Sequence, residues 1–433
     1  MIITSYEFIC AFLPASLIIF FAFSKLSRNA AICALVVSSL LFYCVSGMKY
    51  FPALLISVCV NYFVCMKIES SAKKSWLISG VMFNILLLGY FKYAGNLPPG
   101  ISFWTFSQIA CFAEIYRSSI RLGGFTEYSA FAVFFPYMIS GPVVNPRDIL
   151  PQLRNKSLYR PDYENIAKGI TLFAVGLFKK VCFADMIAPS VNANFVVYGS
   201  IRFSDAWLAA LGYGMQLYFD FSGYSDMAVG IGLMFGLKLP ANFESPYKSL
   251  SIIDFWRRWH MSLGTWIRDY IYIPLGGSRQ GELTRTRNVI LAMLFTGLWH
   301  GLGWTFVVWG LAHGLMLAVN HTWRKFGFRL PALVSWGITF MCVIICWVIF
   351  RAESLNDAMT IIRAMMDFGN FALPNHDEKI TSLLLFAALF MPNSRQILER
   401  FRPNIIWLVA AFGVVVISFV NLSGVSDFLY FQF

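Results

Sequence analysis

The residues of this chain best suited to acid–base chemistry are its histidines, and there are only five of them. His300 lies in the sequence TGLWHG at the end of an apolar run, with Gly297, Gly301 and Gly303 around it. A neutral imidazole suits general-base catalysis near pH 7, and flanking glycines let a backbone or a substrate approach the ring closely. The same features fit a histidine that hydrogen-bonds between two packed helices. The spacing alone favours neither interpretation.

The other histidines are weaker candidates for a catalytic role. His260 closes the cluster FWRRWH. It could orient a substrate or support a second histidine, but a histidine satisfied at the membrane interface is the favoured alternative. His313, in WGLAHG, and His321, beside Arg324 and Lys325, are expected to pack or to cap a helix. No HxxxH or HExxH spacing occurs, so no histidine-based metal site is expected.

Two carboxylates, Asp220 and Asp226, lie six residues apart in the apolar segment FDFSGYSDMAVGIGLMFG. Ionisable groups at membrane depth are costly and need partners. These two could join a proton relay, pair with a buried arginine, or cap a broken helix. The glycines that follow are better explained by close helix packing than by dinucleotide binding, because no Rossmann strand precedes them.

The most unusual polar stretch covers residues 242–287. Between residues 248 and 287 it holds seven basic and three acidic side chains, with Phe255, Trp256, Trp259 and Trp266 among them. Such a segment cannot span a bilayer and is too apolar for a free loop, so it predicts an amphipathic helix at the interface or a segment folded into the protein interior. The i,i+4 spacing of Asp254 and Arg258 favours helix. The basic residues that could hold a phosphorylated substrate include Lys248, Arg257 and Arg258.

These residues must be positioned by membrane helices, because the composition leaves no other option. Of 433 residues, 58% are hydrophobic and 13% are charged, with a mean hydropathy of +0.64. A soluble domain carries about 25% charged residues. The formal net charge of +12 fits cytoplasmic loops at an anionic membrane surface better than a nucleic-acid partner. The chain is therefore expected to be an all-α polytopic membrane protein.

About eleven to thirteen transmembrane or re-entrant helices are expected, since a span needs about 20 mostly apolar residues. Residues 101–116 and 225–239 are apolar but interrupted, so they are candidates for partial or re-entrant segments. The clearer candidates run approximately over 6–24, 30–47, 50–66, 76–94, 128–145, 167–187, 205–222, 288–299, 302–322, 332–350, 380–392 and 404–422.

Several motifs, in order along the chain, resemble those of the membrane-bound O-acyltransferase family. They are GISFWTFSQIACFAEIYR (100–117), FDFSGYSDMAVGIGLMFG (219–236), SPYKSLSIIDFWRRWHMSLGTWIRDYIYIPLGG (245–277), GLWHG (297–301), WGLAHG (309–314) and FLYFQF (428–433). The likeness is greatest to the bacterial branch typified by the alginate O-acetylation subunit, with D-alanyl transfer proteins and peptidoglycan O-acetyltransferases as relatives.

The resemblance implies a fold of membrane helices around a central tunnel and an essential histidine, which corresponds to His300. His260 occupies the position of a second polar residue some 40 residues upstream. Acting as a base, His300 would take a proton from an acceptor hydroxyl that attacks an acyl thioester. Trp299 and Trp304 could line the tunnel, and oxyanion donors could come from His260 or from backbone N–H groups near Gly301.

The resemblance also implies an O-acyltransferase that acetylates a cell-envelope or extracellular polysaccharide, of the alginate, peptidoglycan or cellulose type. The donor is expected to be acetyl-CoA or an acyl-carrier thioester, bound on the cytoplasmic side by the basic stretch, with no bound cofactor or metal. We expect a multi-pass protein of the bacterial inner membrane and an extracytoplasmic transferase partner. A single domain over residues 1–433 would comprise N-terminal spans (1–95), a catalytic core (96–325) and C-terminal spans (326–433).

Two alternatives stay open. One is transfer of D-alanine or of a long acyl chain to a lipid, which differs in the width of channel required. The other is a transporter of an acyl or lipid-linked species without chemistry, for which Asp220, Asp226 and broken helices would be suited. A transporter should tolerate replacement of His300 far better than an acyltransferase.

Overall fold

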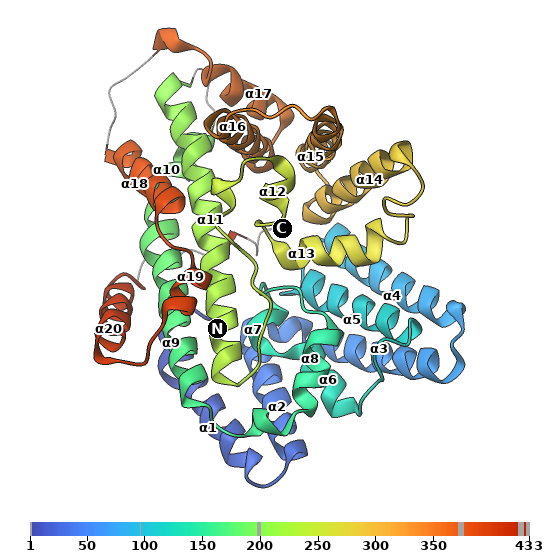
Figure 1. Ribbon diagram of the computed structural model, residues 1–433. Helices are drawn as coiled ribbons and strands as arrows, with labels where there is room; N and C mark the ends of the chain where they lie inside the picture. The colour runs from blue at the N-terminus through green and yellow to red at the C-terminus, as the bar shows by residue number, and fades with distance from the viewer. Residues whose placement is uncertain (1, 96, 197–200, 371–375, 423–427, 430–433) are drawn as a thin grey trace. The chain divides into compact units, whose positions relative to one another are not determined.

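The structure, a computed structural model, describes all residues except 1, 96, 197–200, 371–375, 423–427 and 430–433. Every regular element in this described part is a helix and none is a strand, so the predicted all-α class is confirmed (Figure 1). The last four residues of the FLYFQF motif lie outside the described residues.

The chain forms two compact units, and each unit draws on segments that are distant in the sequence. The first comprises residues 1–177, 224–241 and 400–423. Division of the chain at residues 95 and 325 stays a prediction. The helices of the first unit are α1 (Leu13–Ser24), α2 (Arg28–Gly47), α3 (Phe51–Ser71), α4 (Lys74–Tyr93), α5 (Ile101–Tyr116), α6 (Phe125–Val133), α7 (Phe135–Met138), α8 (Pro146–Arg154), α9 (Tyr163–Phe178) and α20 (Ile405–Val420).

A chain of uncharged polar groups joins four helices of the first unit. Asn84 of α4 donates to the side-chain oxygen of Asn61 of α3 at 2.6 Å. Gln108 of α5 donates to Ser57 of α3 at 3.2 Å and accepts from the Tyr128 hydroxyl of α6 at 3.0 Å. Hydrogen bonds between neutral side chains favour association of apolar helices in a membrane, where unpaired polar groups are costly.

The second unit comprises residues 178–223, 242–399 and 424–433. The long helix α11 (Phe203–Met234) contributes its first part to this unit and its last part to the other. The remaining helices of the second unit are α10 (Asp185–Phe195), α12 (Ile252–Trp256), α13 (Met261–Ile267), α14 (Glu282–His300), α15 (Trp304–Trp323), α16 (Ala332–Arg351), α17 (Leu355–Ala364), α18 (His376–Phe390) and α19 (Ser394–Arg400).

Helices α14 and α15 form a hairpin whose close approach depends on glycine. A side chain at Gly297 would place its Cβ 2.3 Å from the carbonyl oxygen of Phe306, and one at Gly310 would lie 2.6 Å from that of Met293. No Cβ tolerates such distances to backbone atoms. The two backbones can therefore cross here only because both positions lack side chains.

Two of the expected spans differ from the helices observed. Residues 128–145 form two short helices and an irregular segment, because the chain leaves helical geometry at Phe134 and Pro136 begins a new turn. Residues 205–222 and 225–234 instead belong to one uninterrupted helix, α11, which ends before residues 235–239, so neither Asp220 nor Asp226 caps a broken helix. The single Gly223 between them does not interrupt a helix that is packed along its length.

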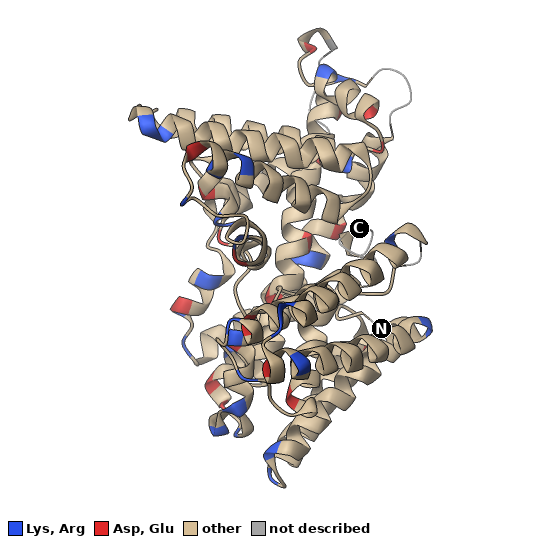
Figure 2. Ribbon diagram, turned by 90° about the vertical axis from the view of Figure 1, so that its right-hand side faces the viewer, with Lys and Arg blue, Asp and Glu red and all other residues tan. Residues whose placement is uncertain are grey.

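The helices carry the features of a membrane protein. Among the described residues, three stretches are long and apolar enough to span a bilayer: 28–71, Lys74–Tyr93 and Ala332–Arg351. Shorter apolar helical stretches cover 8–24 and 405–420, and α20 leaves most of its large hydrophobic side chains exposed. Charged residues lie mostly at helix ends and in loops (Figure 2). The count of eleven to thirteen segments stays a prediction.

Candidate active site

His300 is the last residue of α14 and is only 5% exposed. The helix stops here because Gly301 adopts an extended conformation, while its N–H still donates to the carbonyl of Gly297 at 3.2 Å. The imidazole packs edge-on against Trp309 of α15, with ring centroids 5.4 Å apart, and against Phe350 of α16, at 5.0 Å. Three helices thus fix this ring inside the second unit.

His260 lies between α12 and α13 and is 1% exposed. Its backbone is left-handed, with φ +45° and ψ +50°, a conformation that costs a non-glycine residue about 1–3 kcal/mol. Surrounding contacts must therefore impose this conformation. The backbone N–H of the next residue, Met261, donates to the carbonyl of Asn242 at 3.0 Å, which joins the turn to the loop that contains Asn242.

The side chain of Asn242 determines which nitrogen of His260 carries the proton. Its Oδ1 accepts from the backbone N–H of Ser262 at 3.2 Å and from the Ser262 hydroxyl at 2.9 Å, so this atom is an oxygen and an acceptor. His260 Nδ1 lies 3.1 Å from the same oxygen and must donate to it. Burial lowers the pKa of His260 to about 3, so the ring is neutral at pH 7 and Nε2 is its acceptor.

Both histidines lie beside the ring of the same tryptophan, Trp299. The ring of Trp299 lies 4.6 Å from that of His300 and 6.3 Å from that of His260. Phe221 of α11 packs edge-on against His260 at 4.7 Å. Two residues 40 positions apart, each predicted as catalytic from the sequence, therefore lie in one buried cluster. Asn242, which holds one of them, was not predicted, because its contact depends on the folding of two loops against each other.

A cavity of about 840 Å³ opens between α12, α13, α14 and α15. Three arginines and a histidine line it, together with apolar side chains: Arg257, Arg268, Arg285 and His321. Arg268 and Arg285 pair with Asp269 and Glu282, whereas no carboxylate in the described part of the chain pairs with Arg257. The cavity reaches Thr296, one helical turn before His300.

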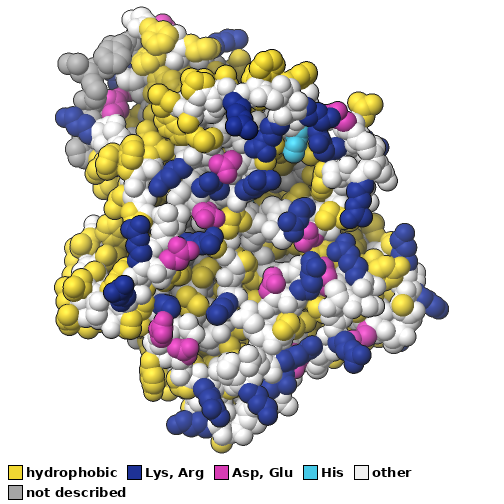
Figure 3. Space-filling view, viewed as in Figure 1, with side chains coloured by type: hydrophobic (Ala, Val, Ile, Leu, Met, Phe, Trp, Pro, Cys, Tyr) yellow, Lys and Arg dark blue, Asp and Glu magenta, His cyan; other side chains and the backbone are white. Residues whose placement is uncertain are grey.

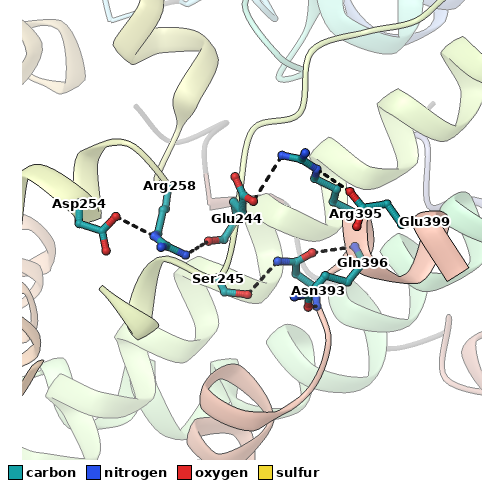
Figure 4. Close-up of polar contacts among 8 residues, drawn as sticks. All are labelled: Glu244, Ser245, Asp254, Arg258, Asn393, Arg395, Gln396 and Glu399. Carbon is teal, nitrogen blue, oxygen red and sulfur yellow. Dashed lines mark hydrogen bonds and ion pairs between the residues drawn. The ribbon is translucent and has the colours of Figure 1, made fainter. Parts of the chain in front are cut away.

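The other two predicted basic residues stabilise the loop that leads to His260. Arg258 bonds Asp254 at 2.9 Å, the i,i+4 pair expected from the sequence, and donates to the backbone oxygen of Glu244 at 3.4 Å (Figure 4). Lys248 donates to the carbonyl of Met391 at 3.1 Å. Neither residue lines the cavity. Partial burial and nearby Arg258 lower the pKa of Lys248.

A second group of contacts clamps the same loop to the beginning of α19. Asn393 Nδ2 donates to Ser245 Oγ at 3.0 Å, and Arg395 pairs with Glu244 at 3.3 Å (Figure 4). Asn393 and Gln396 cap each other's backbone N–H groups at the start of the helix. Ser245 has a left-handed φ of +48°, so this loop also holds a conformation that needs external support.

The remaining predicted site residues are Asp220, Asp226 and Trp304. Asp220 forms a buried ion pair with Lys180 at 2.7 Å and accepts from the backbone N–H of Leu429 at 3.1 Å, so its partner is a lysine rather than an arginine. Asp226 belongs to the first compact unit. Trp304 begins α15 and is 74% exposed, in contrast to the buried Trp299.

His313 has a specific partner that the sequence did not indicate. It lies in the middle of α15, is fully buried, and accepts a hydrogen bond on Nδ1 from the indole N–H of Trp256 at 3.2 Å. Of the two interpretations, packing and helix capping, the structure supports packing. Trp309 lies between the two imidazoles of this region, 4.7 Å from His313 and 5.4 Å from His300.

Comparison with known proteins identifies the family to which the chain belongs. The chain is 39% identical over 431 residues to a peptidoglycan O-acetyltransferase of Helicobacter pylori, covering 87% of this chain and 82% of that protein. It is 38% identical over 407 residues to a probable alginate O-acetylase of Pseudomonas syringae, with 86% and 76% covered. A teichoic acid D-alanyltransferase of Streptococcus thermophilus is 29% identical over 237 residues, with 52% and 57% covered. The profile of the membrane-bound O-acyltransferase family matches residues 7–353, and the chain is a membrane acyltransferase that belongs to this family.

Proposed function

We propose that the protein transfers an acetyl group from a cytoplasmic thioester, so that a hydroxyl of a cell-envelope polysaccharide becomes O-acetylated. The observation that carries this proposal is the pair of buried imidazoles that both lie beside the ring of Trp299. Similarity over most of the chain to a peptidoglycan O-acetyltransferase and to alginate O-acetylases favours acetyl over D-alanyl transfer, since the D-alanyltransferase matches only about half of the chain.

The chemistry proposed for His300 is general-base catalysis. The imidazole takes the proton of the acceptor hydroxyl while the hydroxyl oxygen attacks the thioester carbonyl. The new C–O bond forms, the C–S bond breaks, and the proton passes from the imidazolium to the departing thiolate. The hydroxyl proton goes to His300, so His260, neutral and with Nε2 as its acceptor, is suited to position the bound thioester by accepting a hydrogen bond from one of its N–H groups.

The cavity lined by Arg257 is the proposed site for the phosphorylated end of the donor. From Arg285 on its wall to His300, α14 advances by 15 residues, or about 22 Å at 1.5 Å per residue. A pantetheine arm is long and narrow, so it can carry an acetyl group over such a distance while its phosphate stays among arginines. Both acetyl-CoA and an acyl-carrier protein present this arm.

The setting proposed for the reaction is the bacterial inner membrane, crossed several times by the chain. Lysine and arginine side chains are spread over the face shown in Figure 3, where acidic side chains are fewer, which suits contact with anionic lipid or an acidic carrier protein. The hydroxyl that His300 activates would belong to an extracytoplasmic transferase, which would pass the acetyl group on to the final acceptor, a polysaccharide. The acceptor would be of the peptidoglycan, alginate or cellulose type.

The test measures transfer of the radiolabelled acetyl group from acetyl-CoA to the acceptor hydroxyl in proteoliposomes. It compares wild type with His300→Ala. Leu298→Ala is the matched control, because this side chain lies two residues earlier on α14 and is 47% exposed. We expect label transfer to fall at least about 100-fold in His300→Ala and to persist in the control. Full activity of a folded His300→Ala protein would refute the mechanism.

A second comparison tests the donor cavity. Arg257→Gln should raise KM for acetyl-CoA, because this guanidinium lines the cavity without a carboxylate partner in the described chain. Arg279→Gln removes the same charge from an exposed position of the same basic stretch that does not line the cavity. Equal effects of the two substitutions would show that net charge, and not this cavity, governs donor binding.

A further inference from the structure

Two buried N–H groups project from one turn of α15, on Trp309 and His313. The two residues are spaced i,i+4, their rings lie 4.7 Å apart, and their side chains are 1% and 0% exposed. Neither residue has been given a role in the mechanism above.

The hydrogen bond from Trp256 fixes the protonation of His313. An indole N–H is a donor only, so the atom that receives it, His313 Nδ1, must carry a lone pair. Such a ring is the neutral tautomer with its proton on Nε2, because an imidazolium has no acceptor. His313 is therefore a hydrogen-bond donor at Nε2.

Neither donor is satisfied by the part of the protein that the structure describes. No acceptor lies within hydrogen-bond distance of His313 Nε2 or of Trp309 Nε1 there. A buried donor left without an acceptor costs about 1–3 kcal/mol, and folded proteins pair nearly all such groups. Two of them side by side favour an occupant that presents acceptor oxygens.

The position of the two donors indicates what that occupant is. Trp256, which holds His313, also lines the basic cavity, and Trp309 contacts the ring of His300. The donors thus lie between the proposed phosphate site and the proposed base. The pantetheine arm that would pass from one to the other carries two amide groups, whose carbonyl oxygens need donors when they are buried among aromatic rings.

We propose that His313 Nε2–H and Trp309 Nε1–H form a binding subsite for the amide carbonyls of a pantetheine arm. This inference rests on the proposed function, because it assumes that the acyl donor enters from the basic cavity. The subsite selects thioesters of pantetheine over thioesters that lack amides. CoA and a phosphopantetheinylated carrier protein share this chemistry, and either can supply it.

The experiment measures equilibrium binding of CoA, free 4′-phosphopantetheine and 3′,5′-ADP to the full-length protein in detergent. Trp309→Phe keeps an aromatic ring and removes the N–H. His313→Phe does the same, whereas His313→Gln retains an acceptor for Trp256 and an N–H donor. Trp104→Phe is the matched control, since Trp104 is a buried indole of the other compact unit and its N–H also has no acceptor in the described chain.

We expect Kd for CoA and for 4′-phosphopantetheine to rise about tenfold in Trp309→Phe and His313→Phe, with partial recovery in His313→Gln. Binding of 3′,5′-ADP, which has no arm, should not change in these variants. A CoA affinity well above that of 4′-phosphopantetheine in wild type would identify CoA as the source of the arm, and equal affinities would favour a carrier protein.

The outcomes separate this inference from the proposed function. If CoA binds wild type, Arg257→Gln weakens it, and both phenylalanine variants bind it as well as wild type does, the subsite is wrong and the donor cavity stands. If CoA, 4′-phosphopantetheine and 3′,5′-ADP all fail to bind wild type, the donor cavity and the subsite are both wrong. Weakening of CoA binding by Trp104→Phe equal to that by Trp309→Phe would assign the loss to general packing and overturn the subsite.

Discussion

Replacement of Asn242 by alanine should disable the site without touching either histidine. The amide oxygen of Asn242 accepts three hydrogen bonds, from the His260 ring and from the backbone and hydroxyl of Ser262. Alanine removes this acceptor and leaves a buried ring N–H and a buried backbone N–H unsatisfied. The left-handed backbone of His260 then has less to hold it in place.

The size of the effect follows from these contacts. Each unsatisfied buried donor costs about 1–3 kcal/mol, so Asn242→Ala should lower the free energy of unfolding by about 2–4 kcal/mol after partial relaxation. Relaxation of the His260 backbone also recovers part of the roughly 1–3 kcal/mol of strain, and it turns the imidazole away from Trp299. Loss of one group that positions the substrate lowers catalysis by about 100-fold.

Asn242→Asp separates support of the loop from control of the imidazole. The carboxylate can accept the same three hydrogen bonds, so the loop should stay in place. A carboxylate beside the ring favours the imidazolium and raises the pKa of His260 from its lowered value. Because the neutral ring is the active form, activity should be retained at high pH and lost as pH falls through the raised pKa.

The assay is kcat and KM for acetyl transfer between pH 5.5 and 9, with thermal unfolding of each variant recorded in the same detergent. Wild type should show no titration of His260 in this range, and Asn242→Asp should show a new acid limb. If Asn242→Ala matched wild type in both kcat and thermal stability, the assignment of Asn242 as the residue that positions His260 would be refuted.

Three further predictions concern other contacts. Lys180→Met should destabilise the protein by about 3–5 kcal/mol in thermal or chemical unfolding, because it leaves the buried carboxylate of Asp220 without its ion pair, and an unchanged melting temperature would contradict this. Gly297→Ala should abolish activity, since its Cβ would lie 2.3 Å from a backbone oxygen. The control Gly303→Ala should be active, because its Cβ would meet nothing closer than 3.5 Å. Equal activities of the two variants would show that helices α14 and α15 can move apart. Asn393→Ala should lower kcat more than it raises KM for the donor, because it frees the loop that leads to His260 and leaves the cavity intact, and a change in KM alone would exclude this role.

The two histidines that we propose for the reaction could be selected from the sequence, but their surroundings could not be predicted. His300 stands out because ionisable residues are rare at the end of an apolar segment, whereas His260 was selected only by the family resemblance; the structure places both beside Trp299. Asn242 and His313 act through partners 18 and 57 residues away in the chain. Local patterns carry no information about such contacts, which arise only when the helices pack.

The same limit explains the errors in the fold. The apolar stretch 128–145 looked long enough for a span, but Pro136 and the turn at Phe134 divide it. In the basic stretch, the i,i+4 pair of Asp254 and Arg258 was predicted correctly, yet the helix around it has only five residues. The alternative of a segment folded into the interior fits the buried aromatic side chains there. Length and hydropathy identify apolar helices but do not determine where backbone turns interrupt them.

The contacts between the loop of Glu244 and the start of α19 have a consequence for biosynthesis. The contacts join Ser245 to Asn393, 148 residues later in the chain, and Glu244 to Arg395, 151 residues later. During translation the loop that leads to His260 is made long before the segment that contacts it. A chain that ends before Asn393 lacks both contacts, so we expect its loop to be less ordered and its turnover of thioester to be low. Hydrolytic loss of acetyl groups is then expected only once nearly the whole polypeptide has been made.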